Sequence, residues 1–163
     1  MPRASQFDPY RTFKFKVRFG DTPGTAVAGV MKVSALSRTV AANELKQGGD
    51  LTGPLQNPGA VHYDDVVLER GLSADAIFES WANAVVQLLS DPSSVSNFKR
   101  TVYIDVYDLA GNPGDTTSLP ITTYKLNRAW VTKYTALPEL DAGAGNFGIQ
   151  SLTLRHEGWE RVA

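Results

Sequence analysis

The stretch VVLERGLSADAIFESWANAVVQLL, residues 66–89, predicts a short apolar strand that leads into a helix. Within its second half, apolar side chains recur every three or four positions while polar side chains fall on the opposite side, as in a helix with one buried face. We expect the helix to span 73–89, with Ser73 as its N-cap and the Asp91-Pro92 pair ending it. The predicted core face consists of Ile77, Phe78, Trp81, Val85 and Leu88, widened by Leu89.

The clearest strand pattern comes earlier, at residues 13–19, where apolar and cationic side chains alternate strictly. Alternation with a period of two is typical of a strand with one buried face. The other face carries a row of cations, which has two interpretations: an ordinary solvated strand face, or the lining of a water-filled passage shared by several subunits. The row consists of Lys14, Lys16 and Arg18.

The remaining apolar segments predict further strands, about seven in all, and no other helix. We expect an irregularity near Asn127-Arg128 and a bulge near Gln150-Ser151, because the apolar period changes at both places. The chain therefore predicts a mainly β protein: an antiparallel β-sandwich or barrel with one flanking helix. The other expected strands are 26–36, 39–47, 61–69, 101–107, 121–134 and 147–157.

Residues 48–60 hold four glycines and two prolines and predict a long loop between two strands. A long loop in a compact domain is usually functional or disordered. It could be a surface excursion, but its position between strands favours an assembly loop. The residues that we expect to make inter-subunit or inter-ring contacts are Glu44, Lys46, Gln47, Asp50, Leu51, Leu55 and Gln56.

Size and composition restrict the possible functions. The 163 residues suit a single domain over 1–163, of which residues 1–10 are expected to form a flexible N-terminal arm. The net charge of −1 does not suit a nucleic-acid-binding protein, and the absence of cysteine excludes disulfides and thiolate-ligated metals. There is no signal-peptide pattern and no apolar run of about 20 residues, so we expect synthesis and assembly in the cytoplasm and no membrane insertion as a monomer.

Two clusters of residues have side chains that could form a metal or catalytic site, but each is more simply interpreted as structural. His62 with Asp64 and Asp65 has the residue types of a metal site, but neighbouring residues on a strand point to opposite faces. His156-Glu157 is accompanied by no nucleophile elbow, phosphate-binding loop or zinc-protease motif. We therefore expect no catalytic residues, no cofactor and no metal.

Several segments, in order along most of residues 8–160, resemble the inner tail-tube proteins of contractile phage tails and phage-derived contractile injection systems. Two departures are Ala35, where that family usually has glycine, and Gln150, where an acidic residue is frequent. The matching segments are 33–36 (VSAL), Glu44 with 47–49 (QGG), 68–72 (LERGL) leading to Trp81, 124–130 (YKLNRAW) with Lys133-Tyr134, 139–142 (ELDA) and 152–158 (LTLRHEG).

The resemblance implies a structural subunit, not an enzyme. Six copies would form a ring, and stacked rings would form a rigid tube inside a contractile sheath. The expected partners of the subunit are other copies of itself, the sheath protein, baseplate or initiator and cap proteins, and cargo protein or DNA in the lumen. The assembled tube would be part of a virion or an injection particle. The alternatives are the type VI secretion-like hexameric ring protein, a baseplate-end tube initiator or, from another class, a small β-barrel binding module or hydrolase.

Overall fold

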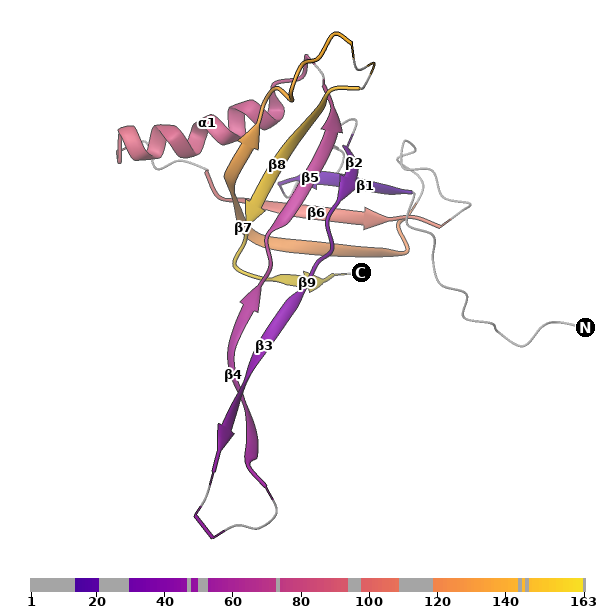
Figure 1. The fold of residues 1–163 in the computed structure, drawn as a ribbon. Coiled ribbons are helices and arrows are strands. Elements are labelled where there is room, and N and C mark those ends of the chain that lie inside the picture. Colours follow the sequence, from indigo (N-terminus) through magenta and orange to yellow (C-terminus); the bar gives the residue numbers. More distant parts are fainter. Residues whose placement is uncertain are drawn as a thin grey trace, which may run out of the picture.

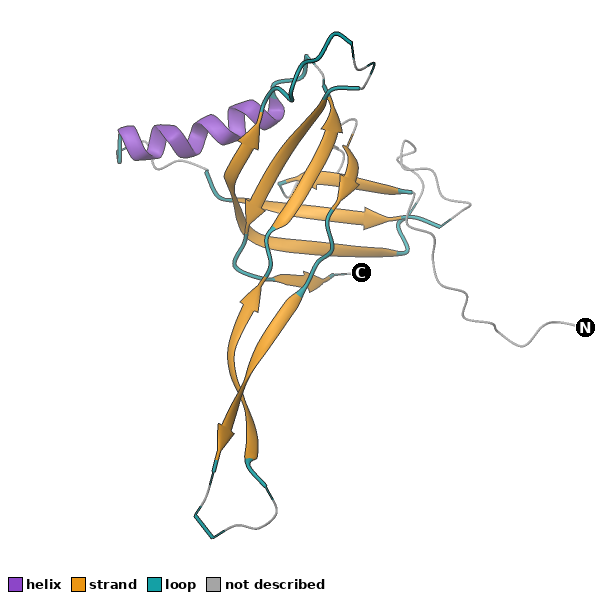
Figure 2. Cartoon of the chain, in the orientation of Figure 1, coloured by secondary structure: helices purple, strands orange, loops and turns teal. Residues whose placement is uncertain are grey.

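The computed structural model gives a mainly β protein with one helix among the residues that it describes (Figures 1 and 2). The predicted arm at 1–10 and the predicted N-cap Ser73 lie outside these residues. The described residues are 14–20, 30–46, 48–49, 53–72, 74–93, 98–108, 119–143, 145 and 147–162.

Seven described strands form one antiparallel sheet, which confirms the predicted fold class. Two more strands form a separate hairpin, which was not predicted. The sheet is open: β1 and β2 are the two ends of its path, so it does not close into a barrel. The strand order is β1 (Phe15–Phe19), β6 (Arg100–Val106), β7 (Thr122–Thr135), β8 (Ile149–Arg155), β5 (Val66–Gly71) and β2 (Val30–Val33), with β9 (Trp159–Arg161) paired to β7. The hairpin consists of β3 (Arg38–Leu45) and β4 (Leu55–Tyr63).

The long strand β7 belongs to both layers of the sandwich. Its first half pairs with β6 and β9, and its second half pairs with β8. Between the halves, Arg128 has a φ of 49°, and the pairing with β6 slips by one residue. This bulge confirms the irregularity predicted near 127–128. It turns the sheet, so that β5 and β8 cross over β6 and the first half of β7 (Figure 1).

The core lies between the two layers and follows the predicted alternation. In β8 the buried side chains are those of Gln150, Leu152 and Leu154, while the pairing with β5 runs without a break from Ile149 to Leu154. The predicted bulge at 150–151 is therefore wrong: Gln150 is a buried polar residue and preserves the alternation. The apolar side chains with no exposed surface include Val66, Leu68, Val102, Leu126, Leu152 and Leu154.

The helix α1 (Ile77–Ser90) begins four residues later than predicted. Its N-cap is Ala76, and Asp75 Oδ1 accepts a hydrogen bond of 3.1 Å from the Ile77 amide in place of a Ser73 cap. Phe78 and Trp81 are fully buried and pack against Phe19, whose ring centroid lies 4.7 Å from that of Trp81. The first turns of the helix therefore hold it against the sheet.

The second half of α1 extends past the edge of the sheet (Figure 1). Ile77 and Val85 pack at the margin of the core, and Leu88 is half-buried. Leu89, expected to widen the core face, is 81% exposed. That expectation is wrong because no described strand lies beneath the last turn of the helix.

Candidate assembly surfaces

The β3–β4 hairpin stands away from the sandwich (Figure 1). All eight residues of β3 and most of those of β4 are exposed. The expectation of a loop across 48–60 is wrong from Leu55 onward, because residues 55–60 pair with β3. An isolated two-stranded hairpin is marginally stable in water, so this element has the form of a contact surface. Its exposed large apolar side chains are Val40, Leu45, Leu55 and Val61.

The predicted contact residues lie toward the far end of this hairpin. Leu45 is paired with Leu55 across the strands, and Gln56 Nε2 donates a 3.0 Å hydrogen bond to Glu44 Oε1. Lys46 follows them and is exposed. The other three candidates, Gln47, Asp50 and Leu51, lie outside the described residues.

The predicted cationic row consists of Lys14, just before β1, and of Lys16 and Arg18 on β1, and it lies on the outer face of the sandwich. The three side chains differ in their contacts. Arg18 Nε and Nη2 donate to Asp105 Oδ2 and Oδ1 at 2.7 and 3.1 Å, and its guanidinium lies 4.8 Å from the Tyr103 ring centroid. Asp105 is 2% exposed and also accepts a 2.8 Å hydrogen bond from Thr123 Oγ1. Lys16 is opposite Asp105 in the strand pairing. One acidic residue therefore offsets part of this row.

The same acidic residue affects Tyr107, which is 3% exposed. Burial raises the pKa of the Tyr107 phenol, and the negative charge of Asp105 raises it further, while Arg18 acts in the opposite direction. The region is therefore a packed polar network, in which the phenol stays neutral to higher pH than usual.

Arg70 has a structural role that the sequence pattern did not predict. Arg70 is 1% exposed, and its Nε donates to Gln150 Oε1 at 3.1 Å. Its Nη2 donates to the Asp75 carbonyl, and its guanidinium lies 4.2 Å from the Phe78 ring centroid. One arginine thus joins β5, β8 and the start of α1. The sequence did hold a signal for this role: Arg70 is a charged residue at an inward-facing position of an otherwise apolar strand.

Among the described residues, the contacts of the two histidines are structural. His62 is exposed, with its Nε2 3.6 Å from Asp64 Oδ1. The buried His156 accepts a 3.2 Å hydrogen bond at Nδ1 from the Gly158 amide, so its Nε2 donates to the Asp64 carbonyl at 3.0 Å. Among the described residues, no group of three or more His, Cys, Asp or Glu side chains could hold a metal ion.

The described surface has several hollows, and two of them are lined mainly by apolar residues. An apolar cleft of about 380 Å³ lies between the layers, and Trp159, whose buried Nε1 has no hydrogen-bond partner in the described structure, lines it. A second hollow of about 730 Å³ lies in the connection between β7 and β8, beside Leu140, Phe147 and Ile149. Of the described helical residues, no run is long and apolar enough to cross a bilayer.

The described chain thus combines open sheet edges with a projecting, exposed hairpin. The family model for the T4-like virus tail tube protein gp19 matches residues 11–160. The chain belongs to this family and is a tail tube subunit. A comparison with curated proteins finds no match.

Solved structures share the fold over nearly the whole chain. A chain from the anti-feeding prophage (AFP) baseplate is 24% identical with a TM-score of 0.76, covering 97% of this chain and 98% of that one. A chain from the extended sheath–tube complex of the extracellular contractile injection system PVC is 20% identical with a TM-score of 0.72, covering 95% and 92%. Hcp1 from Flavobacterium johnsoniae is 13% identical with a TM-score of 0.52, covering 91% and 94%.

Proposed function

We propose that this chain is the subunit of the rigid inner tube of a contractile injection machine. Six copies form a ring, rings stack into a hollow tube, and contraction of a surrounding sheath drives the tube outward as a passive conduit. The tail tube family and the fold shared with the AFP and PVC chains support this proposal. The role is structural and not catalytic.

The free-standing hairpin is the observation that carries the proposal. Its exposed apolar side chains lack any cover from the described part of their own chain, and copies of the same chain would supply that cover. In the described sheet, the end strands β1 and β2 each pair with one neighbour, which leaves edges available to adjacent copies. A closed ring satisfies such edges and stops lateral growth.

The free-energy cost of ordering the β3–β4 hairpin controls when subunits assemble. Fixing one residue's backbone costs about 1–2 kcal/mol, so ordering about ten residues costs on the order of 10 kcal/mol. Such a cost keeps free subunits soluble until a preformed ring, such as a baseplate, offers a surface. Spontaneous tube formation by the purified subunit at micromolar concentration would contradict this mechanism.

The family and the fold shared with the AFP and PVC chains support a set of proposed partners. They are other copies of this chain, a sheath protein, baseplate or initiator proteins, a cap, and cargo protein or DNA in the lumen. The subunit is made and assembled in the cytoplasm, without membrane insertion, and becomes part of a virion or an injection particle. The solved AFP baseplate and PVC sheath–tube complexes hold chains of this fold.

We assign the row Lys14, Lys16 and Arg18 to the lumen. The ion pair between Arg18 and Asp105 reduces its net charge, which suits a passage through which cargo slides. Lys16→Glu should change cargo retention in purified particles and leave tube length unchanged. Loss of rings in this variant would instead place the row at an interface.

The main test is electron microscopy of particles from cells that express the complete machine, with and without this chain. The proposal expects hollow striated tubes with six-fold rings that contain this chain, and no tubes without it. Featureless monomers and unchanged tubes would contradict it. One copy of a ring per particle, measured by quantitative mass spectrometry, would identify a baseplate-end initiator, the second candidate favoured by the likeness to the AFP baseplate chain.

A further inference from the structure

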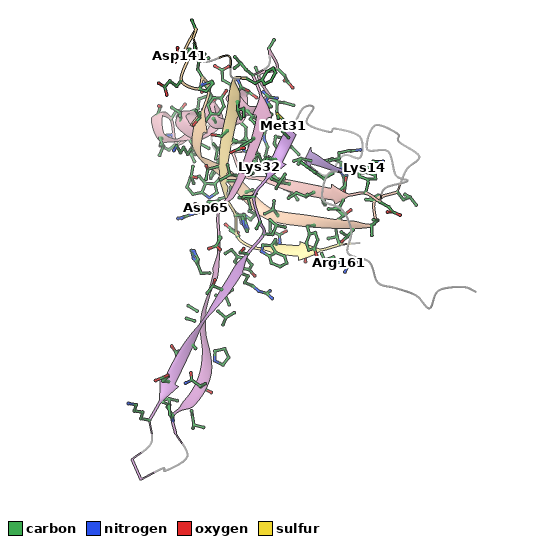
Figure 3. The ribbon with its side chains drawn as sticks, turned by 45° about the vertical axis from the view of Figure 1, so that its right-hand side comes forward. Lys14, Met31, Lys32, Asp65, Asp141 and Arg161 are labelled. Atoms are coloured by element: carbon green, nitrogen blue, oxygen red, sulfur yellow. The ribbon has the colours of Figure 1, made fainter. Side chains whose placement is uncertain are left out.

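The apolar cleft between the two layers of the sandwich is bordered by both end strands of the sheet. Phe15 belongs to β1, Val33 belongs to β2, and both line the cleft. Figure 1 shows β2 in one layer and β1 and β6 in the other, and Figure 3 labels Met31 on β2 and Arg161 on β9. The volume of about 380 Å³ lies within the range of small-molecule sites. The apolar lining consists of Phe15, Val33, Leu36, Ile104, Val106 and Tyr124.

Trp159 also lines the cleft, and its indole N–H is a buried donor without a partner in the described structure. Nearly all buried polar groups in native proteins are paired, because an unmade hydrogen bond leaves the cost of desolvation uncompensated. Edge contacts with Tyr124 and Tyr63, at centroid distances of 5.9 and 6.5 Å, hold the ring in place. An acceptor bound in the cleft would therefore complete the hydrogen bonding of this indole.

Arg38 adds a cation beside the same indole. Ser34 and Leu36 line the cleft, and the chain then reaches Arg38 at the start of β3. The Arg38 guanidinium lies 5.5 Å from the centroid of the Trp159 ring and forms no ion pair with another described residue. Stacking on an aromatic ring uses the flat face of a guanidinium and leaves the N–H groups at its edge able to bind a carboxylate.

From these contacts we propose that the cleft binds a small monocarboxylic acid with an apolar body, such as a medium-chain fatty acid. The apolar lining receives the hydrocarbon, while Trp159 Nε1 and the Arg38 guanidinium donate hydrogen bonds to the carboxylate. The described lining contains no acidic side chain, so the cleft offers donors without an anion of its own. One guanidinium balances one negative charge, which favours a carboxylate over a doubly charged phosphate. This binding site goes beyond the proposed tube function and does not depend on it.

Nuclear magnetic resonance of the purified subunit tests the site, with decanoate as the probe at about pH 7, where the acid is ionised. Each of the three tryptophans gives one indole N–H resonance, and Trp159→Phe identifies the one that belongs to Trp159. Decanoate should shift the Trp159 resonance downfield, because a new hydrogen bond forms at Nε1. Trp81 is the internal control: its Nε1 already donates to the Phe98 carbonyl at 2.7 Å, so its resonance should not move.

Substitutions separate binding of the carboxylate from binding of the apolar body. Arg38→Gln should weaken decanoate binding by about tenfold, the effect of one charge-assisted hydrogen bond, and should leave binding of decanol unchanged. Arg155→Gln is the matched control, because Arg155 is also exposed but pairs with Asp65. Val106→Phe places a larger side chain in the cleft and should abolish the shift for both probes, while an unmoved Trp81 resonance would show that the fold is retained.

Three results would overturn the inference. A Trp159 resonance that stays in place throughout the decanoate titration would mean that water or another part of the chain already completes the indole. Equal binding of decanoate and decanol, unaffected by Arg38→Gln, would show an apolar pocket without a carboxylate site. A Trp159 resonance that moves with protein concentration alone would show that a second copy of the chain occupies the cleft.

Discussion

Arg18 and Asp105 form a two-point ion pair between β1 and β6, with Nε–Oδ2 and Nη2–Oδ1 distances of 2.7 and 3.1 Å. The carboxylate is almost fully buried, and the guanidinium is only slightly exposed. Thr123 satisfies Asp105 further. The pair ties an end strand of the sheet to its neighbour by side chains as well as by backbone pairing.

Removal of the cation should therefore destabilise the subunit. Arg18→Met leaves the Asp105 carboxylate buried without its counter-charge, which should lower the free energy of unfolding by about 3 kcal/mol. Lys16→Met, on the same face but without a described ion pair, should change it by less than about 0.5 kcal/mol. Urea denaturation of the monomer measures both, and equal effects would contradict the assigned role of Arg18.

Arg70 should contribute as much to the stability of the subunit as Arg18 does, because it holds the start of α1 against the sheet. Arg70→Met leaves Gln150 Oε1 and the Asp75 carbonyl without their donor, so we expect a loss of about 3 kcal/mol in unfolding free energy. The matched control is Arg155→Met, because Arg155 forms an exposed ion pair with Asp65 that contributes at most about 1 kcal/mol. Thermal unfolding followed by circular dichroism compares them. A larger effect at Arg155 would refute the account.

Tyr107 should give the subunit an alkaline sensitivity. Its pKa in the folded state is raised, mainly by burial, so the unfolded chain releases this proton first as pH rises. The stabilisation is complete below the ordinary tyrosine pKa of about 10 and is lost as pH rises through the folded value. Tyr107→Phe should flatten the fall of unfolding free energy above about pH 10. An unchanged slope between pH 9 and 11, as measured by denaturant titration, would contradict this assignment.

Glu157 should make the stability of the subunit fall as pH becomes acidic, because its pKa is lowered in the folded state. A 2.8 Å hydrogen bond from Lys99 Nζ lowers the pKa of Glu157, with a smaller contribution from Arg128. A depressed folded pKa contributes stability above the unfolded value, and this contribution is lost as pH falls through the folded value. Lys99→Met should raise the pKa of Glu157, as followed by NMR titration. A pKa that stays unchanged would show that the bond is absent in solution.

The sequence predicted the parts of the fold that bury an apolar face. The strand at 15–19, the helix carrying Trp81 and the break at Asn127-Arg128 all follow from periodicity, because one side of each element faces the core. The antiparallel sandwich with a flanking helix follows from the same signal.

The features that the sequence did not predict either have no buried apolar face or carry a polar residue at a buried position. β4 begins with Leu55-Gln56-Asn57-Pro58-Gly59 and is exposed on both sides, so no alternation marks it as a strand. Gln150 is a polar residue at a core position and imitates a bulge. Arg70 is buried by contacts with residues distant in sequence, and no local pattern reports those.

Hydrogen–deuterium exchange of the β3–β4 hairpin, compared between the free subunit and the assembled tube, tests the central claim most directly. The account predicts that amides of residues 38–45 and 55–63 exchange rapidly in the free subunit, because an isolated hairpin is marginal, and at least about 100-fold more slowly in the tube. Core amides of β5 and β8 should be protected in both states. Equal exchange of the hairpin in subunit and tube would contradict the claim that neighbouring copies complete it.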